Sequence, residues 1–91
     1  MVEIIGNQIY RDGIKIGWFA GDGIFDETGK KIGYFSSSAV FDAKGEIMAR
    51  VEGDRVFSGS RTIDLEQVIH NVSGVGISDS GKVAIAMFLG D

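Results

Sequence analysis

The stretch IYRDGIKIGWFA, residues 9–20, recurs twice in modified form, as IFDETGKKIGYFS at residues 24–36 and as VFDAKGEIMARVE at residues 40–52. A fourth unit begins at Arg55 and loses the pattern after Gly59, and the sequence suggests a fifth unit at residues 76–89. The period of about 16 residues is shorter than the roughly 30 or more that helical and propeller repeats need. It matches one β-hairpin per unit, so the repeat predicts a chain of hairpins.

The residues at the centre of each unit are typical of hairpin turns. Asp12-Gly13 is a two-residue turn signal, because both residues tolerate a positive φ. DETG, DAKG and SDSG, at residues 26–29, 42–45 and 78–81, predict a type I turn closed by a left-handed glycine. The Asp of each turn is expected to accept hydrogen bonds from nearby backbone amides. A metal site built from these acids is not expected, since each hairpin tip carries one and successive tips splay apart.

Alternation along the predicted strands places apolar side chains on both faces of the sheet. A sheet with one solvated face would be polar on that side. Either the sheet closes around a filled core and also packs outward, or a partner buries the second face. Gly17, Gly33 and Ala49 recur at one register, which indicates that another element approaches the sheet closely there.

One helix is predicted, at about residues 64–73. Leu65, Val68, Ile69 and Val72 have the spacing of an apolar helical stripe, and Asp64 precedes them as an N-cap. A helix this short needs a docking surface, so we expect it to plug or cap the hairpins. The predicted fold is therefore mainly β, with repeated antiparallel hairpins closing into a shallow barrel or flower with one short α-helix.

Length and composition predict a single domain spanning residues 1–91. The chain contains no cysteine, and its formal charge of −4 is spread along the sequence. A nucleic-acid partner and a membrane surface are not expected, because both select clustered basic residues. The sequence shows no secretion signal and no apolar run of membrane-spanning length, so a cytoplasmic location is expected.

The spacing of glycine, aspartate and aromatic residues in units such as GIFDETGKKIGYF, over residues 5–58 and 75–88, resembles that of the β-flower proteins. These are small pseudo-symmetric barrels of repeated hairpins, similar to the tubby and LURP-one-like barrels that wrap strands around a hydrophobic helix. The resemblance implies a shallow barrel. Tubby barrels bind phosphoinositide head groups through basic residues, whereas the basic residues here are scattered beside acids.

An enzyme is not expected, because the sequence has no cysteine nucleophile, no nucleophile-elbow motif and no phosphate loop. The sole histidine, His70, is expected to be solvated beside Glu66 on the predicted helix. No cofactor is expected either.

A non-enzymatic binding or protein-interaction module, forming a homo-oligomer, is the favoured function. Trp18, Phe19 and Tyr34 are the candidate contacts, with the alternative that all three belong to the core. A second hypothesis is a protein, such as a phage-encoded one, that sequesters a small molecule or nucleotide at a barrel mouth. That mouth would be rimmed by Asp22, Ser36, Ser37, Ser38 and Arg55, although a serine run is also typical of a connecting turn. Lipid-head-group binding is a third hypothesis, by analogy with tubby-like barrels.

Overall fold

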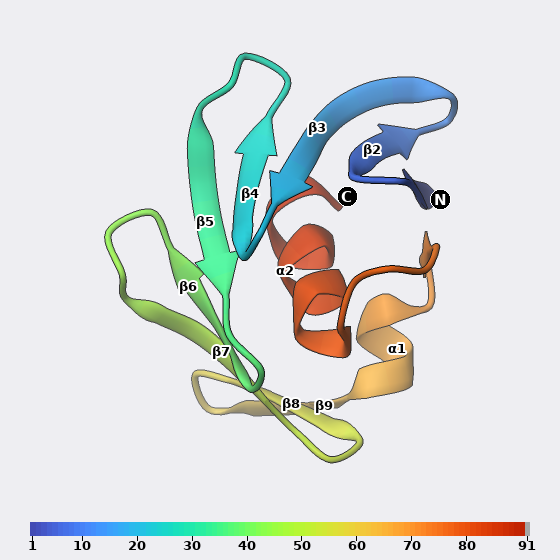
Figure 1. Cartoon of the computed structure of the whole chain (residues 1–91). Helices are drawn as coiled ribbons and strands as arrows, with labels where there is room; N and C mark the ends of the chain where they lie inside the picture. The colour runs from blue at the N-terminus through green and yellow to red at the C-terminus, as the bar shows by residue number, and fades with distance from the viewer. Residues whose placement is uncertain (91) are drawn as a thin grey trace.

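The computed structural model of the chain describes residues 1–90, which form a mainly β structure wrapped around a helix (Figure 1). The strands are β1 (Val2–Ile5), β2 (Gln8–Arg11), β3 (Ile14–Ala20), β4 (Gly23–Asp26), β5 (Lys31–Phe35), β6 (Ala39–Asp42), β7 (Ile47–Glu52), β8 (Arg55–Ser58), β9 (Arg61–Asp64) and β10 (Val72–Ser73). The helices are α1 (Leu65–Ile69) and α2 (Asp79–Leu89). The strands lie in one sheet in the order β10-β1-β2-β3-β4-β5-β6-β7-β8-β9, antiparallel throughout except for the parallel pair β1–β10.

The predicted hairpins are present, and their tips point outward from the central helix α2 (Figure 1). The turn at residues 26–29 has the predicted geometry, because Gly29 has φ +90° and Asp26 Oδ1 accepts hydrogen bonds from the backbone amides of Thr28 and Lys30. The equivalent turn at residues 42–45 repeats both features. The pKa of the Asp26 carboxyl lies below its ordinary value of 3.8, mainly because the Thr28 hydroxyl donates a further hydrogen bond to it.

The predicted fifth hairpin unit is wrong, since its residues form α2. Ser78 is the N-cap of this helix, and its Oγ accepts a hydrogen bond from the Gly81 amide at 3.2 Å. A short polar side chain that binds a backbone amide is equally suitable for a helix cap and for a hairpin turn, so SDSG has the chemistry of both. The segment after it is apolar on several sides. The spacing of apolar residues in such a segment does not distinguish a strand from a helix.

The predicted helix at residues 64–73 is present in a shorter form, as α1. It ends at Ile69, and Val72 belongs instead to β10, where it pairs with Val2 of β1. This helix does not plug the sheet, because α2 occupies the centre (Figure 1). Instead α1 contacts α2, β8 and β9, and it connects the two edge strands of the sheet, β9 and β10. The sheet therefore does not close into a barrel through strand pairing.

The register of small residues is where α2 meets the sheet. A Cβ atom on Gly33 would lie 2.5 Å from the Phe88 ring, and one on Gly17 would lie 3.1 Å from a Leu89 methyl group. The prediction of a close approach is confirmed, with α2 rather than α1 as the approaching element. Side chains that line the resulting core and are fully buried include Ile9, Ile24, Val40, Val56, Val83 and Ile85.

Two polar contacts hold α2 at its ends. The hydroxyl of Ser80, which is 2% exposed, donates to the Ser37 carbonyl at 2.9 Å. At the other end the Arg11 guanidinium donates to the Leu89 carbonyl. A cation is favourable there, because the carbonyls at a helix C-terminus carry partial negative charge. Among residues 1–90, no helix is long and apolar enough to cross a bilayer.

Candidate functional site

The outer face of the sheet, which points away from α2, carries a stacked pair of aromatic rings in the first repeat unit. Trp18 on β3 lies directly opposite Phe25 on β4, and their ring centroids are 5.7 Å apart with planes 11° from parallel. The Lys15 Nζ lies 5.2 Å from the centroid of the Trp18 ring. The unit therefore combines a cross-strand ring pair with a cation–π contact.

The second unit repeats this arrangement. Tyr34 on β5 stacks on Phe41 of β6 with centroids 4.8 Å apart, and the Lys31 Nζ lies 4.9 Å from the Tyr34 ring.

In both units the ring also reaches the turn of the next hairpin. A Cβ atom added to Gly29 would lie 3.6 Å from the Trp18 ring. A Cβ atom added to Gly45 would lie 3.2 Å from the Tyr34 hydroxyl oxygen. In these units the chain thus fills the space between adjacent hairpins with an aromatic side chain of its own.

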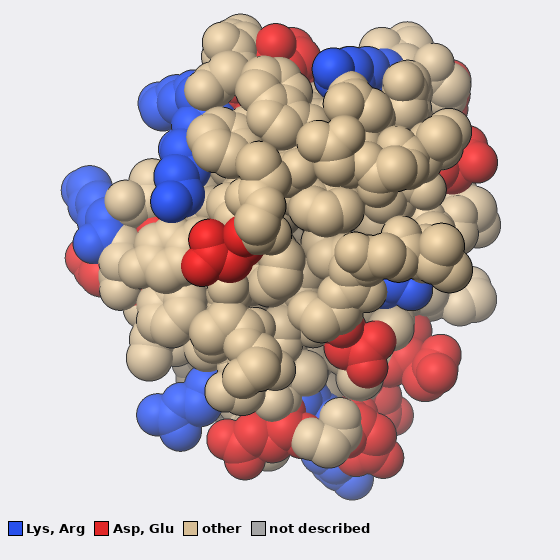
Figure 2. Space-filling model, in the orientation of Figure 1, with Lys and Arg blue, Asp and Glu red and all other residues tan. Residues whose placement is uncertain are grey.

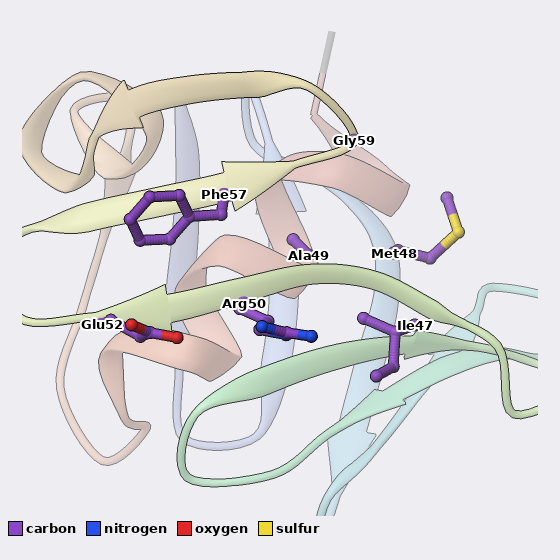
Figure 3. Close-up of a pocket in the computed structure, with 7 residues that line it drawn as sticks. All are labelled: Ile47, Met48, Ala49, Arg50, Glu52, Phe57 and Gly59. Atoms are coloured by element: carbon purple, nitrogen blue, oxygen red, sulfur yellow. The ribbon is translucent and has the colours of Figure 1, made fainter.

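The third unit departs from the pattern. Arg50 occupies the position of Trp18 and Tyr34, and Ile47 occupies the position of the two lysines. Phe57, opposite Arg50 on β8, is 37% exposed, and within residues 1–90 no ring stacks on it. A groove of about 460 Å³ lies here, which we call the β7–β8 groove (Figure 3). It is lined by Ile47, Met48, Ala49, Arg50, Glu52, Phe57 and Gly59.

The β7–β8 groove is lined by both apolar and charged side chains. Ile47 and Met48 are 56% and 38% exposed, so with Phe57 they present three apolar side chains to solvent. Arg50 and Glu52 lie next to each other along β7 (Figure 3) and add one charge of each sign. Within residues 1–90, no group of three His, Cys, Asp or Glu side chains is arranged to hold a metal ion.

The structure places the three predicted aromatic contacts in different environments. Trp18 and Tyr34 are half-buried on the outer face, each in its own stack. Phe19 is half-buried and packs against the core on the other side of the sheet.

The residues of the predicted mouth lie in or beside the connections between successive hairpins. Ser36 and Ser37 are exposed in the connection between β5 and β6, where the Ser37 carbonyl accepts the hydrogen bond from α2. Arg55 is exposed at the start of β8, with its Nε 3.9 Å from the carboxylate of Asp54. None of the six predicted binding residues lines the β7–β8 groove.

The signal for the groove was present in the repeat alignment. Two columns of the alignment change at the third unit. Lysine at residues 15 and 31 is replaced by Ile47, and the aromatic residues Trp18 and Tyr34 are replaced by Arg50. The change at these columns does not by itself show which surface is uncovered, because that depends on the strand of the next hairpin. Ile47, Met48 and Phe57 were missed for that reason.

The charged side chains on the face shown in Figure 2 are of both signs and are dispersed around its edge, with large uncharged areas between them. His70 is exposed just after α1, with Glu66, Gln67 and Asn71 around it.

No family model, no curated protein and no solved structure matches this chain. The fold by itself defines a small, mainly β protein in which repeated hairpins form one sheet around a helix.

Proposed function

We propose that this protein is a non-enzymatic interaction module and that the β7–β8 groove binds an aromatic side chain of a partner polypeptide. The observation that supports the proposal is the internal comparison of the three units. In two of them the equivalent space holds an aromatic ring stacked on a phenylalanine, and in the third the phenylalanine is present without the ring.

The energetics favour a ring as the ligand. A stacked aromatic pair contributes about 0.5–1.5 kcal/mol beyond the burial of its apolar area. Ile47 and Met48 add apolar surface beside Phe57, and the Arg50 guanidinium can interact with the face of an incoming ring. Glu52 can accept a hydrogen bond from an indole N–H or a tyrosine hydroxyl.

Two alternative functions are less well supported. Sequestering of a planar small molecule would rely on the same uncovered Phe57 ring. The wrapping of antiparallel strands around an apolar helix supports the proposed likeness to β-flower and tubby-like proteins. Lipid-head-group binding requires a basic cluster, and the dispersed charges in Figure 2 favour it less.

The test is an NMR titration of the ¹⁵N-labelled full chain with N-acetyl-tryptophanamide, and with N-acetyl-leucinamide as the aliphatic control. The tryptophan probe is expected to shift the backbone amide signals of β7 and β8 and to bind at least about fivefold more tightly than the leucine probe, because only a ring can stack on Phe57.

A variant that fills the groove from within provides the matched test. Arg50→Tyr copies Tyr34 of the preceding unit, so its ring is expected to cover Phe57 and to weaken the tryptophan probe about tenfold. Lys44→Tyr, which places the same side chain on the exposed turn between β6 and β7, is expected to bind the probe like the natural chain. Equal binding of both probes, or unchanged binding by Arg50→Tyr, would contradict the proposal.

A further inference from the structure

Phe57 is the one exposed Phe, Tyr or Trp side chain among residues 1–90, and it lies in the β7–β8 groove. The other Phe, Tyr and Trp side chains of this part of the chain are buried or half-buried, and four of them form the two outer stacks. Phe57 is therefore both the platform on which a ring can stack and the ring that this molecule offers to a neighbour.

We infer that the polypeptide that docks in the β7–β8 groove is a second copy of this chain, related by a two-fold axis that passes beside Phe57. The inference rests on the proposed function of the groove. In a two-fold dimer both subunits use the same surface patch, so the patch must be complementary to itself. Phe57 meets this condition, because it stacks on Phe57 of the partner subunit as Phe25 and Phe41 stack on rings within the chain.

The charges of the groove are also complementary to themselves. Arg50 and Glu52 are two residues apart on β7, so their side chains point to the same face of the sheet, and both are exposed. A two-fold axis that passes midway between Arg50 and Glu52, one residue along the strands from the Arg50–Phe57 pair, brings Arg50 opposite Glu52 of the partner subunit, and the reverse pair forms at the same time. A patch of a single charge sign would repel its own copy.

The small size of the patch predicts a dimer that dissociates on dilution. Seven residues line the groove, whereas a stable interface of standard size uses about 20–30 residues on each side. The ion pairs at its rim are exposed to solvent, so raised salt is expected to weaken the association.

Sedimentation equilibrium of the full chain over a range of concentrations tests the inference. The mass is expected to rise from that of the 9.8 kDa monomer toward twice that value as concentration increases. Arg50→Glu and Glu52→Arg, each alone, place like charges opposite each other and are expected to weaken the dimer at least about tenfold. The double variant carrying both changes is expected to recover most of the association, because it restores two opposite-charge pairs.

The control is Ile14→Asp, a charge introduced at an isoleucine on β3 that is 69% exposed and lies outside the groove, which is expected to leave the dimer unchanged. A dimer that persists in both single charge reversals would use another surface and would overturn the inference. A double variant that dimerises as weakly as the single variants would also overturn the inference. A chain that stays monomeric while it binds N-acetyl-tryptophanamide would overturn the second copy as partner and leave the proposed function standing. A chain that neither dimerises nor binds N-acetyl-tryptophanamide would overturn both the inference and the proposed function.

Discussion

At the scale of single residues, the approach of α2 to the sheet is set by the absence of side-chain atoms at one register. Gly33 lies where the Phe88 ring packs, and a Cβ there would also lie 2.7 Å from the Phe41 carbonyl oxygen. Ala49 occupies the equivalent position on β7 and is 1% exposed, so that strand does accommodate a methyl group. The size of the residue at this position of the repeat thus matches the space that α2 leaves at each strand.

Gly33→Ala is expected to lower the free energy of unfolding by about 1–3 kcal/mol, because the added methyl group forces the Phe88 ring or the backbone to move. Urea unfolding followed by circular dichroism measures the change. Ala49→Gly at the same register is the control, and its expected cost of about 1 kcal/mol or less comes from backbone entropy. A Gly33→Ala chain as stable as the natural one would mean that α2 can shift away from β5 without cost.

At the scale of elements, one motif serves two structures. Residues 26–29 and 78–81 both begin with a short polar residue and end in glycine. The first closes a hairpin, with Gly29 at φ +90°, and the second starts α2, with the Ser78 hydroxyl oxygen bound to the Gly81 amide. The difference lies in the segment after each motif, since Lys31–Phe35 alternates between the two sheet faces whereas Val83, Ala84 and Ile85 are all fully buried.

Ser78→Ala removes the N-cap of α2 and is expected to cost about 1 kcal/mol of stability, within a range of roughly 0.5–2. Thermal unfolding of the variant beside the natural chain measures the loss. Ser73→Ala, an exposed serine on β10, is the matched control and is expected to change stability by less than about 0.5 kcal/mol. If both variants unfold at the same temperature, the cap contributes nothing to the stability of α2.

At the scale of the whole molecule, the sheet and α2 depend on each other. The sheet is open between β9 and β10, so strand pairing does not hold its two edges together. The inner face of the sheet packs against α2, which contributes three side chains that are 0% exposed. Each buried Val or Ile side chain contributes about 1.5–3 kcal/mol, so the contact with α2 stabilises the sheet as well as the helix.

A chain truncated after Gly76 lacks α2 and is expected to lose its cooperative unfolding transition, because the inner sheet face becomes exposed to solvent. Circular dichroism melting and binding of a hydrophobic dye measure the result, and strong dye binding without a sharp transition is the expected outcome. A truncated chain with a cooperative melt would show that the hairpins form a stable sheet by themselves.

The hairpins, their turns and the register of small residues could be predicted from the sequence alone. These features are local, since a turn such as residues 26–29 is specified by its own aspartate and glycine, and strand alternation is specified by neighbouring side chains. The short helix α1 was also predictable from its apolar spacing, although its end at Ile69 was not, because Val72 pairs with β1 at the opposite end of the chain.

Three features depend on long-range packing: which segment fills the centre, the open sheet, and the groove of the third unit. A short apolar run adopts a helix or a strand according to what surrounds it, and α2 is surrounded by strands that come from most of the chain. The β7–β8 groove depends on the third and fourth hairpins lying side by side, so that a missing ring on one strand exposes a phenylalanine on the next. Such features arise from long-range packing, which the local chemistry of the repeat does not contain.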